Sequence, residues 1–374
     1  MQSAQNLQDQ SGQHKKCKVE TDAKTILSYR KLAEEGNADA QYQLGHLYEH
    51  NHGAVEKNIN EAFRLYCLSV AQGNANAQWR LGYLYLCGSG VEKDEKQAAH
   101  LFRLSANQGN AGAQNYLGYL HQQGLGVEKN LKEAVRLYRL AAAQGYPNAQ
   151  HNLAYLYKGN RGIEKNLKEM VHFLRLAAEQ EEPTSQNILA GIYENGLNEK
   201  GIKVKKDLKE AARLYRSAAE QGLADAQNNL GLLYLEGMGV KKDLKEAVRF
   251  FRLAAKQGCA SAQYNLGYMY ENGEGVKKDL KEAICLYRLS AAQGDEHAKK
   301  ALKNLEEKDI ITTHINRLIF LKEQSKKTEN SKLSDKKESK KEPSPKTRLE
   351  EYDEIIQPYL TYKAPAQSII ALSA

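Results

Sequence analysis

A segment of sixteen residues recurs along the chain and constrains its fold more than any other feature. The text NLKEAVRLYRLAAAQG at 130–145 returns nearly unchanged as DLKEAVRFFRLAAKQG at 243–258 and as DLKEAICLYRLSAAQG at 279–294. Aligning the chain with itself gives seven units, which begin at Ala38, Ala75, Ala111, Pro147, Pro183, Ala224 and Ala260. A spacing of 36, 37 or 41 residues is typical of stacked supersecondary units, each of which buries its apolar face only against its neighbours.

Each unit contains the apolar pattern of two amphipathic helices. In the third unit the first helix is marked by Ala113, Leu117, Leu120 and His121, and the second by Leu131, Ala134, Val135, Tyr138, Ala141 and Ala142. Both sets follow the 3.6-residue period of a helix with one buried face. A tight loop such as GLGVEKN at 124–130 joins them, so each unit is predicted to be a helix-turn-helix hairpin.

Recurrent capping residues predict where the second helix of each unit begins and ends. An Asn or Asp stands three residues before a Glu or Gln, which is the spacing of a capping box. The pairs are Asn58 and Glu61, Asp94 and Gln97, Asn130 and Glu133, Asn166 and Glu169, Asp207 and Glu210, Asp243 and Glu246, and Asp279 and Glu282. A Gly follows the helix in six units, at a position whose left-handed conformation favours it. The fourth unit has Glu181 there, so an irregular helix end is expected.

A small residue recurs in the middle of every first helix. It is Gly45, Gly82, Gly118, Ala154, Ala190, Gly231 or Gly267. A glycine inside a helix costs about 1 kcal/mol relative to alanine. Its return at one register therefore predicts a close approach between helices, where a larger side chain would clash.

The segment AQNNLGLLYLEGMGVKKDLKEAVRFFRLAAKQG at 226–258 resembles the Sel-one-like repeat, a relative of the tetratricopeptide repeat. The resemblance covers residues 21–305. It implies an all-α fold, a right-handed α/α superhelix (solenoid) of seven helix-turn-helix repeats with partial capping repeats, and a concave groove lined by the first helices. Members of the family mostly serve as adaptors and scaffolds for protein complexes. A non-enzymatic scaffold that binds a protein or peptide partner is therefore the leading hypothesis.

The sequence divides into six predicted segments. Residues 1–20 are a disordered N-terminus and 21–37 a partial repeat. The seven repeats occupy 38–294, and 295–321 form one or more capping helices. A basic disordered linker at 322–349 leads to a C-terminal peptide at 350–374.

By analogy with tetratricopeptide repeats, fixed positions of each first helix are expected to line the groove and bind the partner. They are Tyr42, His46, Trp79, Tyr83, Asn115, Tyr119, His151, Tyr155, Asn187, Asn228, Tyr264 and Tyr268, and the same register holds Gly191 and Leu232. Aromatic rings offer contact area and Asn amides can hold the backbone of an extended peptide. The alternative is that these side chains pack neighbouring first helices together.

Two other sets of aromatic residues are predicted to be structural. The first set, three residues further along the first helices, matches the aromatic residue of the family pattern. It comprises Tyr48, Tyr85, Tyr157, Tyr193, Tyr234 and Tyr270. The second set lies on the second helices and comprises Tyr66, Phe102, Tyr138, Tyr215, Phe251 and Tyr287. A five-residue insertion lengthens the loop NGLNEKGIKVKKD at 195–207, for which a tolerated surface loop and a binding loop are both considered.

Most of the formal charge of +8 lies in one C-terminal segment. Residues 322–348 hold ten Lys or Arg and five acidic residues, without an aromatic side chain. This composition predicts a linker that attracts an acidic membrane surface only weakly, and nucleic acid is an unlikely partner because no stacking residue accompanies the lysines. Beyond it, Glu350, Glu351 and Glu354 form EExxE, which resembles the C-terminal signal of bacterial type IV secretion substrates. The alternative hypothesis is accordingly an effector that leaves the cell without a signal peptide and acts on host proteins through the same groove.

The sequence contains no pattern of a catalytic, cofactor or metal site. It has no P-loop, Rossmann glycine fingerprint or H-E-x-x-H motif, so no enzyme activity, small-molecule substrate, cofactor or metal is expected. The five cysteines lack paired spacing, which predicts free thiols and a cytoplasmic setting. β-Lactamase activity has been attributed to family members with a disulfide in each repeat, and this chain lacks those cysteines. The N-terminus has no apolar signal-peptide core, and no apolar run is long enough to span a membrane.

Overall fold

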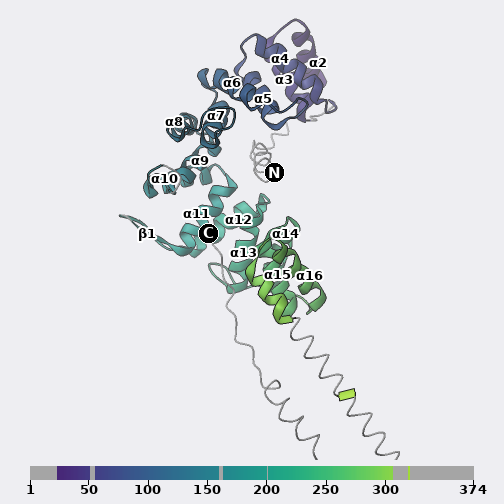
Figure 1. Cartoon of the computed structure of the whole chain (residues 1–374), viewed down its shortest axis with the longest axis vertical. Helices are drawn as coiled ribbons and strands as arrows, with labels where there is room; N and C mark the ends of the chain where they lie inside the picture. The colour runs from purple at the N-terminus through teal and green to yellow at the C-terminus, as the bar shows by residue number, and fades with distance from the viewer. Residues whose placement is uncertain (1–22, 51–54, 160–162, 200, 306–318, 321–374) are drawn as a thin grey trace, which may run out of the picture. The chain divides into compact units, whose positions relative to one another are not determined.

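The computed structural model describes residues 23–50, 55–159, 163–199, 201–305 and 319–320. Within this part of the chain every predicted unit folds into two helices (Figure 1). The first helices are α3 (Ala38–His50), α5 (Ala75–Cys87), α7 (Ala111–Gln123), α9 (Pro147–Tyr157), α11 (Pro183–Asn195), α13 (Ala224–Glu236) and α15 (Ala260–Asn272). The second helices are α4 (Ile59–Ala71), α6 (Glu95–Asn107), α8 (Leu131–Ala143), α10 (Leu167–Glu179), α12 (Leu208–Glu220), α14 (Leu244–Lys256) and α16 (Leu280–Ala292). The chain is an all-α solenoid of seven helix-turn-helix repeats.

The chain divides into two compact units, residues 1–226 with 238–240 and residues 227–237 with 241–374. The first unit contains α2 (Ala23–Glu34), which precedes the first repeat within the segment predicted to be a partial repeat. In the second unit, residues 296–305 are helical and follow α16. The predictions for residues 1–20, for the linker and for the C-terminal peptide lie outside the described residues.

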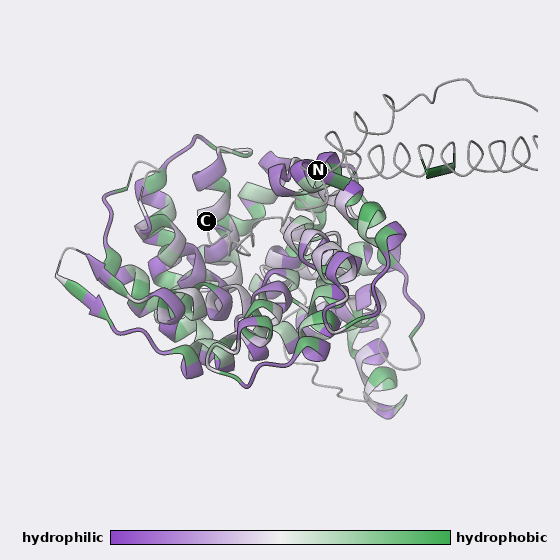
Figure 2. Cartoon of the chain, turned by 90° about the horizontal axis from the view of Figure 1, so that it is seen from below, coloured by the Kyte–Doolittle hydropathy of each residue, from purple (hydrophilic) through white to green (hydrophobic). Residues whose placement is uncertain are grey.

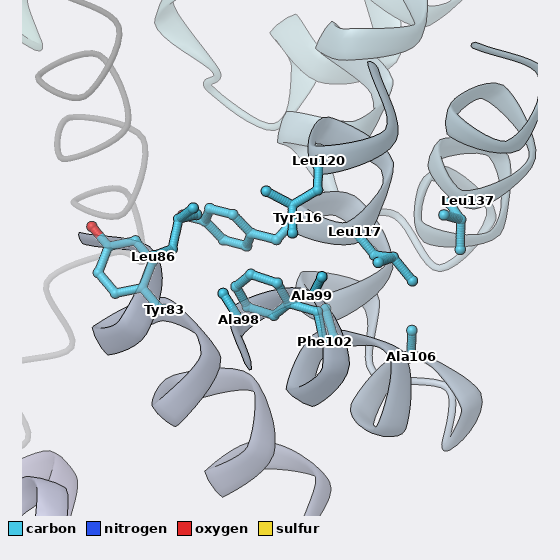
Figure 3. Close-up of a cluster of buried hydrophobic side chains, with 11 residues drawn as sticks. Tyr83, Leu86, Ala98, Ala99, Phe102, Ala106, Tyr116, Leu117, Leu120 and Leu137 are labelled. Carbon is cyan, nitrogen blue, oxygen red and sulfur yellow. The ribbon is translucent and has the colours of Figure 1, made fainter. Parts of the chain in front are cut away.

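The helices are amphipathic, and hydrophobic and hydrophilic residues alternate along them (Figure 2). The aromatic residues predicted to be structural on the second helices are confirmed in that role, since each is at most 2 % exposed: Tyr66, Phe102, Tyr138, Tyr215, Phe251 and Tyr287. Figure 3 shows one such cluster, in which the ring of Tyr116 stacks on Phe102 with 5.3 Å between their centroids.

The predicted helix starts are confirmed, with one change in the hydrogen-bond pattern. In all seven second helices the Asn or Asp side chain accepts a hydrogen bond from the backbone N–H three residues later. The Glu does not complete a capping box. In the third repeat, the N–H of Asn130 donates to the carbonyl of His121 (2.8 Å), while Glu133 pairs with Arg136. The carbonyl at this register of the first helix thus replaces the Glu carboxylate as the partner of the cap N–H.

The helix ends follow the prediction in six repeats, and the expectation for the fourth is wrong. Glu181 adopts φ 64°, and it is the one non-glycine residue with positive φ in the described part of the chain. Its N–H donates to the carbonyl of Ala178 (3.0 Å), as the N–H of Gly145 donates to that of Ala142 (2.9 Å). The fourth repeat therefore keeps the regular helix end and accepts an unfavourable backbone conformation, which costs an L-residue about 1 kcal/mol.

The predicted close approach at the mid-helix small residue is confirmed, and it occurs within each hairpin. A Cβ atom added to Gly118 would lie 2.9 Å from the ring of Tyr138, and one added to Gly231 would lie 2.7 Å from that of Phe251. At these glycines the aromatic ring of the second helix lies directly on the first helix, and the fifth repeat combines Ala190 with Tyr215. In the fourth repeat, where Ala154 replaces the glycine, the smaller Leu174 replaces the aromatic residue.

Four residues after the small residue, the first helix carries a side chain that contacts the aromatic residue of the second helix. Its polarity depends on whether that aromatic residue is Tyr or Phe. Where the second helix carries Tyr, its hydroxyl donates to a carboxylate or amide: Tyr66 to Glu49, Tyr138 to Gln122, Tyr215 to Glu194 and Tyr287 to Glu271, at 2.8 or 2.9 Å. Where it carries Phe, the same position is apolar, with Leu86 opposite Phe102 and Leu235 opposite Phe251. Each buried hydroxyl has an acceptor and each ring without a hydroxyl meets an apolar side chain.

A ladder of glutamine side chains, which was not predicted from the sequence, ties the repeats together. The Gln that follows each second helix donates to a buried Gln of the first helix in the same repeat, in the pairs Gln72 and Gln41, Gln108 and Gln78, Gln144 and Gln114, Gln180 and Gln150, Gln221 and Gln186, Gln257 and Gln227, and Gln293 and Gln263. The buried Gln extends the ladder to the preceding repeat. Gln114 donates to the carbonyl of Ala106 (3.3 Å) and Gln150 to that of Ala142 (3.4 Å).

The five-residue insertion of the fifth repeat forms a short antiparallel hairpin. Its strands are β1 (Leu197–Glu199) and β2 (Ile202–Val204), and Leu197 pairs with Val204. Glu199 forms an ion pair with Lys165 in the inter-helix loop of the fourth repeat (2.8 Å). The insertion is therefore an ordered element that contacts the adjacent repeat.

Candidate partner-binding face

The first helices of the first unit contact one another through side chains at the predicted binding positions. Tyr83 of α5 meets Tyr116 of α7 edge to face, with 5.6 Å between ring centroids. Asn152 of α9 donates to Asn115 of α7 (2.9 Å). Two of the twelve predicted residues, Tyr83 and Asn115, therefore contact a side chain of a neighbouring first helix.

The twelve predicted residues differ in exposure. Tyr155 is exposed, at 36 % of its surface. Tyr42, His46, Trp79, Tyr119, His151, Asn187, Tyr264 and Tyr268 are half-buried. Tyr83, Asn115 and Asn228 are buried, at 7 %, 3 % and 6 % exposed. The set thus combines interior residues with residues that reach the surface.

The three buried residues have the packing role that was the alternative to partner binding. Asn115 accepts its hydrogen bond from the next first helix, and Asn228 in the second unit accepts one from Asn265 (2.9 Å). Tyr83 packs in the cluster shown in Figure 3. Because their surfaces are used within the solenoid, these three residues are not part of the candidate binding site.

Trp79 is held between two repeats and keeps one polar atom without a partner. A Cβ atom added to Gly112 of α7 would lie 2.9 Å from its indole, so the ring packs on the backbone of the next first helix. The guanidinium of Arg80 lies 5.2 Å from the ring centroid. The indole Nε1 is buried and has no hydrogen-bond acceptor among the described residues.

A buried ion pair between the first two repeats was not predicted. Arg80, 5 % exposed, binds both carboxylate oxygens of Glu49, which is 8 % exposed and also accepts from Tyr66. The Nη2 of Arg80 lies 2.7 Å from Nε2 of His50. Burial alone would raise the pKa of Glu49, but the charge and hydrogen bonds of Arg80 outweigh burial and lower it. The pair is saturated within the protein, which makes it a structural element rather than a binding site.

His151 belongs to a second buried polar group, at the junction of the fourth and fifth repeats. Its Nδ1 lies 3.0 Å from Oγ of Ser185 and 3.4 Å from Oε2 of Glu182. Glu182 caps α11 by accepting from the N–H groups of Thr184 (3.0 Å) and Ser185 (2.5 Å). Ser185 is fully buried, and its hydroxyl and the carboxylate meet the same ring nitrogen. A Ser–His–acid relay uses both ring nitrogens, so this group is a helix cap and not a catalytic triad.

Tyr119 and Tyr155 share one register and lie on successive first helices, α7 and α9. Tyr119 of α7 is half-buried beside the cluster of Figure 3, and burial raises the pKa of its hydroxyl. Tyr155 of α9 is the more exposed. With half-buried His151 they place aromatic side chains on α7 and α9.

The chain belongs to the Sel1 repeat family. The family model for the Sel1 repeat matches residues 38–74, 75–110, 111–146, 147–181, 183–223, 224–259 and 260–295, which agree with the seven helical hairpins. Proteins built from Sel1 repeats generally act as scaffolds for protein–protein interaction.

Two solved structures of such proteins are similar to this chain in sequence and fold. A protective antigen of uropathogenic Escherichia coli with an SLR fold is 32 % identical, with a TM-score of 0.67 over 87 % of this chain and 69 % of that one. A Sel1 repeat protein from Oxalobacter formigenes is 31 % identical, with a TM-score of 0.57 over 67 % of this chain and 96 % of that one. No match was found among curated protein sequences.

Metal ligands, membrane spans and disulfides can be assessed for the same part of the chain. Among the described residues, no group of His, Cys, Asp and Glu could hold a metal ion. No helix in the described ranges is long and apolar enough to cross a membrane. The four cysteines with described positions, Cys67, Cys87, Cys259 and Cys285, form no disulfide among the described residues.

Proposed function

We propose that this chain is a non-enzymatic interaction scaffold that binds a peptide or partner protein on the surface of α7 and α9. The contact residues are Tyr119, Tyr155 and His151. Scaffolding is the general role of Sel1 repeat proteins, and the proposal assigns it to one face of one part of the solenoid.

The observation that carries the proposal is the difference between Tyr155 and Tyr83. The two residues share one register of the first helix, directly after the mid-helix small residue. Tyr83 is buried in a packing cluster, whereas 36 % of Tyr155 is exposed. A ring that packs the solenoid needs burial, whereas an exposed Tyr offers the rigid amphipathic area that binding sites use.

The experiment is a photo-cross-linking capture on the full chain. A benzophenone amino acid replaces Tyr155, and the cross-linked proteins from a lysate of the native cells are identified and then expressed for direct binding. The double variant Tyr119→Ala with Tyr155→Ala is expected to weaken binding of the captured partner at least about tenfold, as expected for loss of central aromatic contacts.

A matched control uses two exposed leucines on the second helices of the same region. Leu104 and Leu140 are 38 % and 42 % exposed, so Leu104→Ala with Leu140→Ala removes a similar apolar surface from α6 and α8. Binding should stay unchanged in this control, with circular dichroism showing that both double variants are folded. Loss in the leucine variant with retention in the tyrosine variant would move the site to the second helices.

A further inference from the structure

The inter-helix loops carry a different charge in the last repeats from that in the first. In repeats one to four the loop ends in Glu-Lys before the capping residue: Glu56 and Lys57, Glu92 and Lys93, Glu128 and Lys129, and Glu164 and Lys165. Repeats five to seven have Lys-Lys at the same register, and another Lys follows two residues after the capping residue, as it does in repeats two to four. In the second unit these six residues are Lys241, Lys242, Lys245, Lys277, Lys278 and Lys281, which we call the lysine edge.

The two halves of the lysine edge lie against each other. A Cβ atom added to Gly275, two residues before Lys277, would clash with the carbonyl oxygen of Leu244. The loop of the seventh repeat therefore rests on the backbone between Lys242 and Lys245. The Cβ atom of the second lysine in each pair also packs close to the glycine that ends the first helix of its repeat. A Cβ atom added to Gly237 would lie 3.2 Å from the Cβ atom of Lys242, and Gly273 and Lys278 repeat this distance.

The positive charge of the edge is not neutralised by ion pairs. All six lysines are exposed, and within the described residues none of them forms a salt bridge. In the sixth repeat the nearest carboxylates in sequence are used elsewhere: Asp243 caps α14 by accepting from the N–H of Lys245 (3.0 Å), and Glu246 pairs with Arg249 (2.9 Å). In the seventh repeat Asp279 caps α16 by accepting from the N–H of Lys281 (3.0 Å), while Glu274 and Glu282 stand close to the lysines in sequence. By contrast, in the first unit Lys93 pairs with Glu95 and Lys165 with Glu199.

The edge also offers apolar surface between its lysines. Leu280 stands between Lys278 and Lys281 and is 43 % exposed, and Leu244 holds the same place in the sixth repeat, half-buried. A complementary ligand therefore combines several carboxylates with large apolar side chains.

The chain contains one segment with this composition. Residues 349–356 read LEEYDEII, with four carboxylates within five positions and apolar or aromatic side chains at Leu349, Tyr352, Ile355 and Ile356. Forty-three residues, 306–348, separate it from the last described helix. A chain of that length can extend to about 140 Å, against about 20 Å for a 13-residue helix, so its length does not prevent contact.

We propose that the acidic segment 349–356 docks on the lysine edge of the sixth and seventh repeats. The carboxylates of Glu350, Glu351, Asp353 and Glu354 pair with the lysines, and the apolar side chains cover Leu280. The linker lysines are weaker competitors, because ten basic residues are interspersed there with five acidic ones.

Zero-length carbodiimide cross-linking of the full chain at low ionic strength tests this directly, since it joins carboxylates to lysines in contact. An equimolar mixture of unlabelled and 15N-labelled chains distinguishes links within one chain from links between two. We expect links from residues 350–354 to the lysine edge within one chain, and their loss in 0.5 M salt, where charges are screened within about 4 Å.

The repeats themselves provide the matched variants. Lys241→Glu with Lys277→Glu gives the last two repeats the Glu-Lys of the first four, so the fold tolerates the change. It should reduce the link yield about fivefold, as expected for two reversed surface charges. Lys57→Glu with Lys129→Glu reverses the same number of charges in the first unit and should leave the yield unchanged. Links only to linker lysines, links mainly between labelled and unlabelled chains, or a yield that K241E/K277E does not change would each overturn the proposal.

Discussion

The third and fourth repeats form the same helical hairpin but place different side chains at the contact between its two helices. In the third, Gly118 accepts the ring of Tyr138, whose hydroxyl donates to Gln122, and Gly145 ends the second helix. In the fourth, Ala154 and Leu174 stand at the corresponding core positions, the exposed Lys158 takes the place of Gln122, and Glu181 replaces the terminal glycine. The next residue, Glu182, is buried as the cap of α11. A repeat can therefore lose its consensus residues if they change together and the junction is reinforced.

The largest expected effect concerns that junction. Burial alone would raise the pKa of Glu182, but His151 and Ser185 outweigh it and lower the pKa to about 2. Since the pKa is lower in the folded state, the stabilisation is complete above the unfolded pKa and disappears as pH falls from about 4.5 to about 2. Its size is about 3 kcal/mol for a shift of this kind. Thermal unfolding of wild type and Glu182→Gln should differ clearly at pH 6 and converge near pH 2; a difference independent of pH would contradict this.

Position 118 in the third repeat should tolerate a large side chain less well than position 154, its counterpart in the fourth repeat. Gly118→Leu forces a side chain into the space of the Tyr138 ring and is expected to cost about 2 kcal/mol, as overpacking typically does. The double variant Gly118→Ala with Tyr138→Leu recreates the fourth-repeat pair and should be more stable than Gly118→Leu. Urea unfolding with hydrogen exchange in α7 and α8 measures both.

The matching of hydroxyl and acceptor can be tested within one repeat. Tyr138→Phe leaves the buried amide of Gln122 without its donor and should cost about 1.5 kcal/mol. Adding Gln122→Leu recreates the Phe102 and Leu86 pair of the second repeat, and at least half of the loss should be recovered. Strict additivity of the two substitutions in urea unfolding would show that the residues are not coupled.

The smallest effect is expected at the end of α10. Glu181→Gly removes a side chain from a left-handed conformation and should stabilise the protein by about 1 kcal/mol. The mirror substitution Gly145→Glu in the third repeat should destabilise it by a similar amount. Equal melting temperatures for all three proteins would mean that φ at these positions carries no cost.

Local signals allowed the repeat boundaries, the helix starts and the close approach at the small residue to be predicted, because each depends on residues of one hairpin. The Gln ladder and the match between Tyr138 and Gln122 were also visible as recurrent or covarying residues, but only an alignment of the repeats with one another reveals them. The burial of Tyr83, Asn115 and Asn228 could not be read in this way. It depends on how close the neighbouring first helix lies, which no periodicity within a hairpin specifies. The regular end at Glu181 was missed because stacking on the next repeat outweighs a local preference.

The glutamine ladder has a consequence for how such a gene changes length. In the third and fourth repeats, each rung consists of a Gln pair from its own repeat and an alanine carbonyl from the repeat before it. If recombination removed residues 111–146, the carbonyl of Ala106 would take the place of that of Ala142 as the acceptor for Gln150. Unequal crossing-over between these near-identical segments can therefore add or delete a whole repeat without leaving a buried amide unpaired, and solenoids of different length are accessible from this one in a single genetic event.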